Sequence, residues 1–275
     1  FLCMLRVGGA SLPGRRAARP RESAAPMTRN LHKDARPQAM RATLTEILIV
    51  LALSFGISGV RSVLRLIDDL LNPAPLNEQS VTINSSQSVS PWLDLGLQLC
   101  SAAVLFSWGA LALYLLSVRN KPAAMLERFL RVRDWLQGAG LAALIGLPGL
   151  ALYYSALHFG WTKEVVPTSF DNAWVEMPVL LLKSAANAFA EEVVVVYWFM
   201  TRLRQSGWAL PATLAASSIL RGSYHLYQGV SAGFGNIVMG LVYGYFYAKT
   251  GKVWPLIIAH FLIDAVAFVG YALLF

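Results

Sequence analysis

Charged residues are scarce in this chain of 275 residues: Asp, Glu, Lys and Arg make up only 14% of it, whereas 56% of its residues are hydrophobic. The mean hydropathy is +0.52. Apolar runs of about 20 residues recur along the sequence, and each is long enough to cross a lipid bilayer as a helix. This composition excludes an ordinary water-soluble domain. It predicts an all-α, polytopic transmembrane helix bundle in the lipid bilayer.

Cysteine is almost absent, because the chain holds only Cys3 and Cys100. Two isolated cysteines provide neither a disulfide framework nor a Cys-x-x-Cys metal site. The sequence also lacks His-Glu-x-x-His, the motif that places two zinc ligands and a base on one helix. Other ligand sets stay open, so a divalent metal such as zinc is not excluded, although a metal-free site is favoured.

Positive charge exceeds negative charge, with 23 Lys and Arg against 15 Asp and Glu and a net charge of +8. A nucleic-acid-binding protein would carry these cations on a basic, aromatic-rich domain. The cations lie instead between the apolar runs, where Lys and Arg mark the cytoplasmic side of a membrane protein. We therefore expect no nucleic acid partner.

Seven candidate membrane spans can be placed to within a few residues. Clusters of Lys and Arg lie in the N-terminal tail and in every second loop between these spans, around residues 119–133, 202–204 and 249–252. This bias predicts a cytoplasmic N-terminus for a multi-pass protein of the plasma membrane. The predicted spans are 44–66, 95–117, 136–158, 174–201, 209–227, 234–249 and 253–275.

The spans divide the chain into three predicted regions. Residues 1–42 are rich in Arg, Pro, Ala and Ser, a composition typical of a disordered basic cytoplasmic tail. Whether the residues before Met27 belong to the natural product is left open. Residues 43–173 form the N-terminal transmembrane helices and loops, and residues 174–275 hold the polar groups on which a function can be argued.

Two adjacent glutamates, Glu191 and Glu192, lie within the apolar stretch ANAFAEEVVVVYWFM. An ionisable group inside a membrane span costs several kcal/mol and persists mostly where it faces a protein interior, a partner or water. Packing alone does not explain two adjacent acids in such a stretch. The pair is therefore predicted to be functional.

Three helical faces carry further polar side chains in the last four spans. Residues four apart share one face of a helix, and this spacing groups the polar residues. Glu192 is turned about 100° from Glu191 and need not share its site. Convergence of these faces would bring together carboxylates and two imidazoles. The faces are Lys183, Asn187 and Glu191; Arg221 and His225; and His260 and Asp264.

Such a set of side chains is suited to activating water for peptide-bond hydrolysis. Glu191 would take a proton from the water, and His225 would orient that water. His260 with Asp264 would stabilise the developing oxyanion. Structural roles remain alternatives, since His260 and Asp264 could instead form a hydrogen bond that only stabilises their helix.

The helical rise sets a condition on this convergence. It places Glu191, Arg221 and Asp264 at similar depths, about 15 to 18 Å from the cytoplasmic boundary. His225 comes out deeper, at about 24 Å, and His260 shallower, at about 10 Å. The two imidazoles can therefore meet only if a helix is strongly tilted or broken, or if the span boundaries differ from those predicted.

Three motifs follow one another in residues 174–275, namely AEE, RGSYH and HFLID. Their order and spacing resemble the pattern EExxxR, FxxxH and HxxxN or HxxxD of the CAAX protease and bacteriocin-processing family, also called Abi, of intramembrane endopeptidases. The resemblance implies a catalytic core over 174–275, with Glu191 as catalytic base and Glu192 as its supporting neighbour. It further implies that His225 activates water and that His260 and Asp264 are the oxyanion and positioning pair.

The sequence departs from the family pattern at two positions. Val196 occupies the place of the arginine in the first motif, and Arg221 that of the phenylalanine in the second. The positive charge has thus moved to another helix. Arg221, or alternatively Lys183, is expected to serve as the counter-ion of Glu191 or Glu192 and to keep the net charge of the site near neutral.

The favoured function is an intramembrane endopeptidase that cleaves near the end of a membrane-associated protein or peptide. A proton- or ion-coupled carrier is an alternative, because intramembrane Glu, His, Asp and Lys also build proton relays. A catalytically silent family member that acts as an immunity or scaffold protein is another. The sequence leaves open the substrate, whether that substrate is prenylated, and the oligomeric state.

Overall fold

The computed structural model describes residues 27–119, 131–166 and 173–270. The chain divides into two compact units, Phe1–Arg41 and Ala42–Phe275, and the fold below is that of the second. Several predicted features lie outside the described residues. These are the first 26 residues of the tail, part of the basic 119–133 segment and the last five residues of the seventh span.

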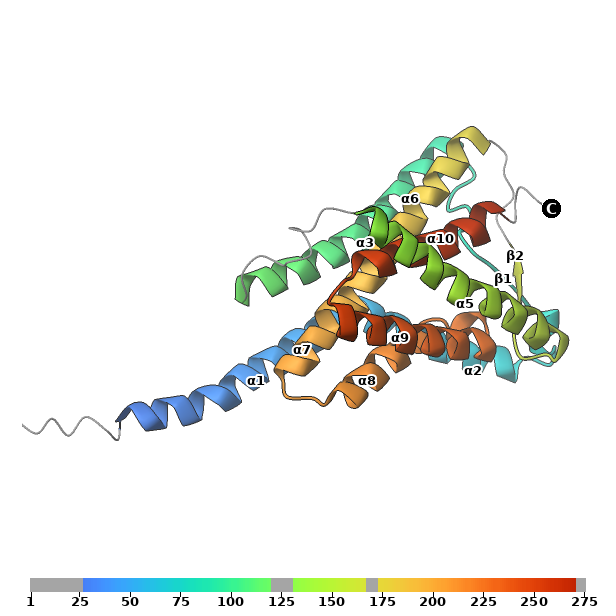
Figure 1. The fold of residues 1–275 in the computed structure, drawn as a ribbon. Helices are drawn as coiled ribbons and strands as arrows, with labels where there is room; N and C mark the ends of the chain where they lie inside the picture. The colour runs from blue at the N-terminus through green and yellow to red at the C-terminus, as the bar shows by residue number, and fades with distance from the viewer. Residues whose placement is uncertain (1–26, 120–130, 167–172, 271–275) are drawn as a thin grey trace, which may run out of the picture. The chain divides into compact units, whose positions relative to one another are not determined.

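Helices account for nearly all of the described residues, and each predicted span coincides with one or two of them (Figure 1). Ser54 separates the first two helices, and the segment Met40–Leu53 is bent by 52° relative to Phe55–Leu71. The helices are α1 (Met27–Leu53), α2 (Phe55–Leu71), α3 (Pro91–Arg119), α5 (Val132–His158), α6 (Ala173–Glu191), α7 (Phe199–Gln205), α8 (Leu210–Ser223), α9 (Val230–Thr250) and α10 (Trp254–Ala265).

Three shorter helical segments complete the C-terminal half. A π-helical segment, η2 (Glu192–Trp198), joins α6 directly to α7. A second π-helical segment, η4 (Val266–Gly270), continues α10. A single 3₁₀ turn, η3 (Leu226–Gln228), lies between α8 and α9.

The number of continuous membrane helices is smaller than the seven spans predicted. In the part of the chain that the structure describes, α3 and α5 are long and apolar enough to cross a membrane. The bent pair of α1 and α2 makes a third span if it is counted as one. Among the other predicted spans, α8 and α10 are too short, with 14 and 12 residues, whereas α6 and α9 are long enough but less apolar than α3 and α5.

The prediction of an all-α fold also needs one correction. Two short parallel strands, β1 (Ser80–Thr82) and β2 (Glu164–Val166), pair in the loops after α2 and α5. Strands of three residues carry too little side-chain alternation to be recognised in a sequence. A further 3₁₀ turn, η1 (Leu76–Glu78), precedes β1.

The predicted disordered tail is helical where the structure describes it. Residues from Met27 onward belong to α1, although a tail without regular structure was expected up to residue 42. Residues 27–42 hold three Arg, three Ala and two Met, which are all good helix formers. The division of the chain into the regions 1–42, 43–173 and 174–275 otherwise stays a prediction.

Opposite ends of the bundle are held by different contacts. At one end, the β1–β2 pair and a bridge between Thr162 and Gly229 join the loops after α2, α5 and α8. At the other end, the Lys252 ammonium lies 2.7 Å from a carboxylate oxygen of Asp134. The loops that were predicted to share a side of the membrane are thus linked to one another.

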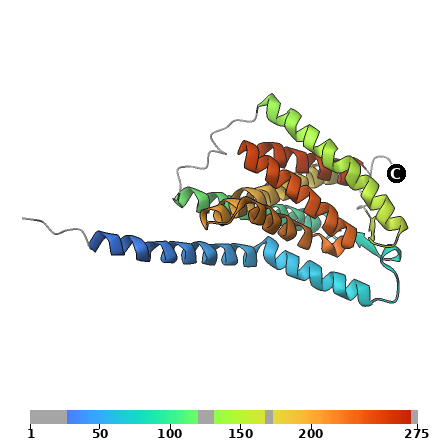
Figure 2. The ribbon, with the colours of Figure 1, turned by 60° about the horizontal axis from the view of Figure 1, so that its bottom comes forward.

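The core of the second unit surrounds η2. Its four consecutive valines, Val193–196, are all completely buried. They can be buried on every side because α3, α6, α7, α8 and α9 pack around this segment. Figure 2 shows α9 and α10 covering one side of the bundle, with α5 beside them. The site described below begins at the first residue of this buried segment.

Small residues allow α8 and α9 to approach closely. A Cβ atom added at Gly240 of α9 would lie 2.9 Å from the Cα atom of Ser218 in α8, closer than carbon atoms normally approach. This contact agrees with the use of glycine in membrane helices to bring backbones together. The close approach brings the Arg221 side of α8 towards α9.

Gly240→Ala is therefore expected to lower the stability of the protein by about 1–3 kcal/mol, because its methyl group overpacks the α8–α9 contact. Thermal unfolding in detergent measures the change. Gly140→Ala in α5 is the matched control, since nothing lies within 4 Å of its added Cβ atom. Equal stability of the two variants would contradict this account of the packing.

Candidate functional site

The two glutamates stand where α6 changes into the π-helical segment η2. Glu191 is the last residue of α6 and Glu192 the first of η2. Only 3% of Glu191 is exposed, and Glu192 is completely buried. A π turn holds one more residue than an α turn and often occurs at functional sites. Both carboxylates lie within ion-pair distance of the same arginine, so Glu192 shares the partner of Glu191 although helical spacing alone did not require it.

Arg221 of α8 is the common partner of the two carboxylates. Its Nη2 atom lies 2.5 Å from Glu192 Oε1, and its Nη1 atom lies 3.7 Å from Glu191 Oε2. The side chain is completely buried, and its guanidinium carbon lies 5.6 Å from the centre of the Tyr243 ring. One guanidinium therefore offsets the charge of two buried acids.

Tyr224 also binds Glu191. Its hydroxyl donates a hydrogen bond of 2.7 Å to Glu191 Oε2. Two contacts with α2 hold the tyrosine, because the Ser62 hydroxyl donates to its carbonyl and Phe55 packs on its ring. Tyr224 was not among the residues singled out in the sequence. Its position in RGSYH, next to a predicted site histidine, was the only available signal.

His260 of α10 approaches the pair through Glu192. Its Nδ1 atom lies 2.8 Å from Glu192 Oε1 and donates to it, since a carboxylate only accepts. Its Nε2 atom lies 3.6 Å from Asp264 Oδ1, which is too far for a hydrogen bond. Asp264 accepts a hydrogen bond of 3.1 Å from the Asn187 amide instead. His260, Asp264 and Asn187 thus form a chain of contacts that starts at Glu192.

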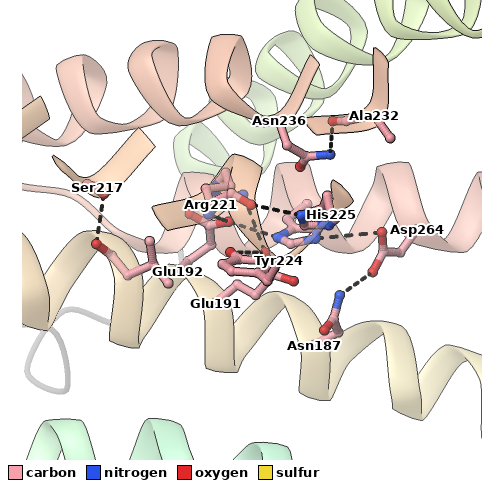
Figure 3. Close-up of polar contacts among 12 residues, drawn as sticks. Asn187, Glu191, Glu192, Ser217, Arg221, Tyr224, His225, Ala232, Asn236 and Asp264 are labelled. Carbon is pink, nitrogen blue, oxygen red and sulfur yellow. Dashed lines mark hydrogen bonds and ion pairs between the residues drawn. The ribbon is translucent and has the colours of Figure 1, made fainter. Parts of the chain in front are cut away.

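His225 reaches the same cluster because α8 ends before it. The helix stops at Ser223, and the chain turns through Tyr224 and His225 into η3. The broken helix is one of the conditions under which the two imidazoles were expected to meet. Figure 3 shows His225 alongside Tyr224 and Arg221, and the rings of His225 and Tyr224 lie 4.7 Å apart.

One hydrogen bond sets the protonation of the His225 ring. Its Nδ1 atom lies 3.1 Å from the carbonyl oxygen of Arg221, which can only accept, so this nitrogen carries the proton. In the neutral ring the Nε2 atom is then a hydrogen-bond acceptor. His225 can therefore accept a hydrogen bond from a water molecule or a substrate N–H.

Lys183 does not join the cluster, although it was the alternative counter-ion. Its ammonium donates a hydrogen bond of 2.6 Å to the side-chain oxygen of Gln98 in α3. Arg221 is the cation that the structure places beside both glutamates. The effect of this charge on activity stays a prediction.

The site leaves some of its polar atoms unsatisfied. In the described parts of the chain, Glu192 Oε2 and the Nε atom of Arg221 are buried without a hydrogen-bond partner. Buried polar atoms of this kind are costly, and the exceptions in native proteins call for an explanation. A functional role for the cluster provides one.

The cluster also resembles a metal site in its donor atoms. One ligand atom from each of Glu191, Glu192 and His260 lies within 4.8 Å of the others. Glu192 Oε1, however, already accepts from both Arg221 and His260. Glu192 Oε2 has no hydrogen-bond partner, but a divalent cation bound there would still lie next to the Arg221 guanidinium, so the arrangement fits a metal poorly.

A comparison with protein families identifies this part of the chain. Residues 173–266 match the family described as type II CAAX prenyl endopeptidase Rce1-like. Residues 173–266 form a Rce1-like domain. This confirms the resemblance drawn from the three motifs. Comparisons with curated proteins and with solved structures gave no match.

The Rce1-like domain runs from α6 to the first residue of η4, and it holds every residue of the predicted site. The family is one of polytopic membrane proteins, in agreement with the candidate membrane helices of this chain. Its CAAX prenyl endopeptidases hydrolyse peptide bonds in proteins. The buried cluster of Glu191, Glu192 and His260 is consistent with an active site of that kind.

Arg221→Met is expected to destabilise the Rce1-like domain by about 3–5 kcal/mol, because it leaves two buried carboxylates without their cation. Thermal unfolding in detergent measures the loss. Combining it with Glu192→Gln removes one of the stranded charges, so the double variant should recover part of the stability. Arg204→Ala, on the exposed side of α7, is the control. A double variant less stable than the sum of the single changes would contradict the ion-pair account.

Proposed function

We propose that this protein is an intramembrane endopeptidase that hydrolyses a peptide bond near the end of a membrane-associated protein or peptide. The observation that carries the proposal is the pair of buried glutamates with unequal surroundings, held by Arg221 within a Rce1-like domain. Buried ionisable groups of this kind mark functional sites in membrane proteins.

The two carboxylates are suited to different roles. Glu192 is completely buried, and one of its oxygens accepts from both Arg221 and His260. Glu191 retains a small exposure and makes its closest contact with the Tyr224 hydroxyl. Glu191 is therefore the carboxylate that can receive a proton from water, whereas Glu192 holds the cationic groups in position.

The proposed reaction begins with a water molecule between Glu191 and the carbonyl carbon of the substrate. Glu191 takes one proton as the water oxygen bonds to that carbon, which gives a tetrahedral oxyanion. The C–N bond then breaks, and the protonated Glu191 returns its proton to the departing amine. The products are a carboxylic acid and an amine, which become a carboxylate and an ammonium by transfer of the remaining water proton, and the glutamate is regenerated.

The two histidines are proposed to act on opposite parts of this reaction. The Nε2 atom of His225 is an acceptor and can orient the attacking water. His260 donates its Nδ1 proton to Glu192, so its Nε2 atom stabilises the oxyanion as a hydrogen-bond donor when the ring is doubly protonated. Asp264, held by Asn187, lies beyond that nitrogen and would position the ring.

The proposed membrane arrangement is polytopic, with a cytoplasmic N-terminus, in the plasma membrane. The linkage of alternate loops at each end of the bundle supports an alternating path of the chain. The basic loop residues support the orientation. Short helices such as α8 cross only part of a bilayer, which suits an active site buried among helices.

The decisive experiment is cleavage of a fluorogenic peptide library by the purified protein in detergent, each reaction run with and without a chelator. The wild type is expected to cleave in both conditions. Glu191→Gln should reduce the rate by at least about 100-fold while the protein still binds the substrate, because the proton acceptor is lost.

Each alternative has its own outcome in this experiment. Loss of wild-type cleavage with the chelator would contradict the metal-free mechanism. Cleavage by Glu191→Gln at the wild-type rate would contradict its role as base. Absence of cleavage of every peptide by the wild type would contradict the endopeptidase and favour a carrier or a scaffold protein.

A further inference from the structure

The turn that follows α8 is held by α2, a helix that lies outside the Rce1-like domain. Three residues of α2 are buried, namely Phe55, Gly59 and Ser62. They follow one another at intervals of four and three, so they share one face of the helix. The helix packs against α8 and η3. Its buried face therefore meets the Rce1-like domain at the turn that carries Tyr224.

Each of these three residues contacts the turn. The Ser62 hydroxyl donates a hydrogen bond of 3.0 Å to the carbonyl oxygen of Tyr224. The last carbonyl groups of a helix lack donors within it, and Ser62 supplies one at the end of α8. The Phe55 ring lies 4.9 Å from the Tyr224 ring, and a Cβ atom added at Gly59 would overlap the hydroxyl of Ser223. The backbone and the ring of Tyr224 are thus both fixed by α2.

The hydroxyl of the same tyrosine determines which oxygen of Glu191 is free. Among the described residues, both polar contacts of Glu191 are made by Oε2, which accepts from Tyr224 at 2.7 Å and lies 3.7 Å from Arg221 Nη1. Oε1 is therefore the oxygen available to a water molecule. Figure 3 shows Tyr224 beside Glu191. Without the tyrosine hydroxyl, the carboxylate could turn and approach the guanidinium, because opposite charges attract strongly in a poorly hydrated site.

We propose that α2 is part of the active site and acts through Tyr224, a positioning residue that keeps Glu191 Oε1 directed at the attacking water. The inference rests on the proposed endopeptidase function and extends its site beyond the Rce1-like domain. Ser62 bonds to the backbone of Tyr224 and not to Glu191, so it positions the base only through the tyrosine.

Loss of the Tyr224 hydroxyl should impair the chemical step and not the binding of substrate. Tyr224→Phe retains the ring that packs on Phe55 but leaves Glu191 free to turn. It is expected to lower kcat by about 10- to 100-fold with little change in KM. Ser62→Ala removes the bond to the Tyr224 carbonyl and should lower kcat by about 3- to 10-fold. Ser62→Thr retains a hydroxyl and should retain the wild-type kcat.

The test is a double-mutant cycle with one fluorogenic peptide and the protein in detergent. Tyr224→Phe, Ser62→Ala and the two combined are each measured for kcat, KM and thermal unfolding. Because Ser62 acts through the tyrosine hydroxyl, the combined variant should cleave no more slowly than Tyr224→Phe alone. Ser58→Ala is the matched control and should leave kcat unchanged. Ser58 lies one turn earlier on α2, and its hydroxyl donates to the carbonyl of Ser54.

Two results would overturn the inference and leave the endopeptidase intact. The first is a wild-type kcat in Tyr224→Phe, with or without a change in KM. The second is a combined variant whose loss of kcat equals the product of the two single losses, because Ser62 would then act independently of the tyrosine hydroxyl. Absence of cleavage by the wild type would instead overturn the proposed function, and the inference with it.

Discussion

The interaction between Arg221 and the two adjacent glutamates is the constraint on which the rest of the site depends. Two carboxylates buried in an apolar bundle are tolerable only with a nearby positive charge. Arg221 supplies it from α8, at 2.5 Å from Glu192 and 3.7 Å from Glu191. The unequal distances leave Glu191 less firmly bound than Glu192, and this asymmetry distinguishes a proton acceptor from a positioning group.

Irregular backbone brings these groups together. A π-helical segment begins at Glu192, and α8 ends two residues before His225. Neither feature would be stable if it were exposed to lipid, where each unpaired backbone group costs several kcal/mol. Both lie inside the bundle, with η2 buried and the turn at His225 tied to α2 through Ser62 and Tyr224. The fold thus allows irregular backbone only where other helices cover it.

Helical spacing predicted much of this arrangement from sequence. Intervals of four picked out the pairs of His260 with Asp264 and of Arg221 with His225, and the misplaced charge pointed to Arg221. Spacing assumes regular helices, so it did not reveal that the π segment turns Glu192 into the site. The valines after Glu192 give no local signal for such a segment. Tyr224 was missed because its contact with Glu191 arises from the turn after α8.

Membrane topology was less predictable than the site. Hydrophobicity located the apolar helices, but it could not distinguish a full span from a short buried helix such as α8 or α10. Helices surrounded by protein can be apolar at any length, because their neighbours and not lipid cover them. The short β1–β2 pair escaped notice for a different reason, since three residues carry no periodic pattern.

The most direct test of the division of roles between the two glutamates compares Glu191→Gln with Glu192→Gln in single-turnover cleavage and in thermal unfolding. Glu191→Gln should abolish cleavage and leave the unfolding temperature nearly unchanged. Glu192→Gln should lower the unfolding temperature, because it weakens the buried pair with Arg221, and should retain some cleavage. A stable Glu192→Gln variant without cleavage, beside a Glu191→Gln variant that still cleaves, would contradict the account.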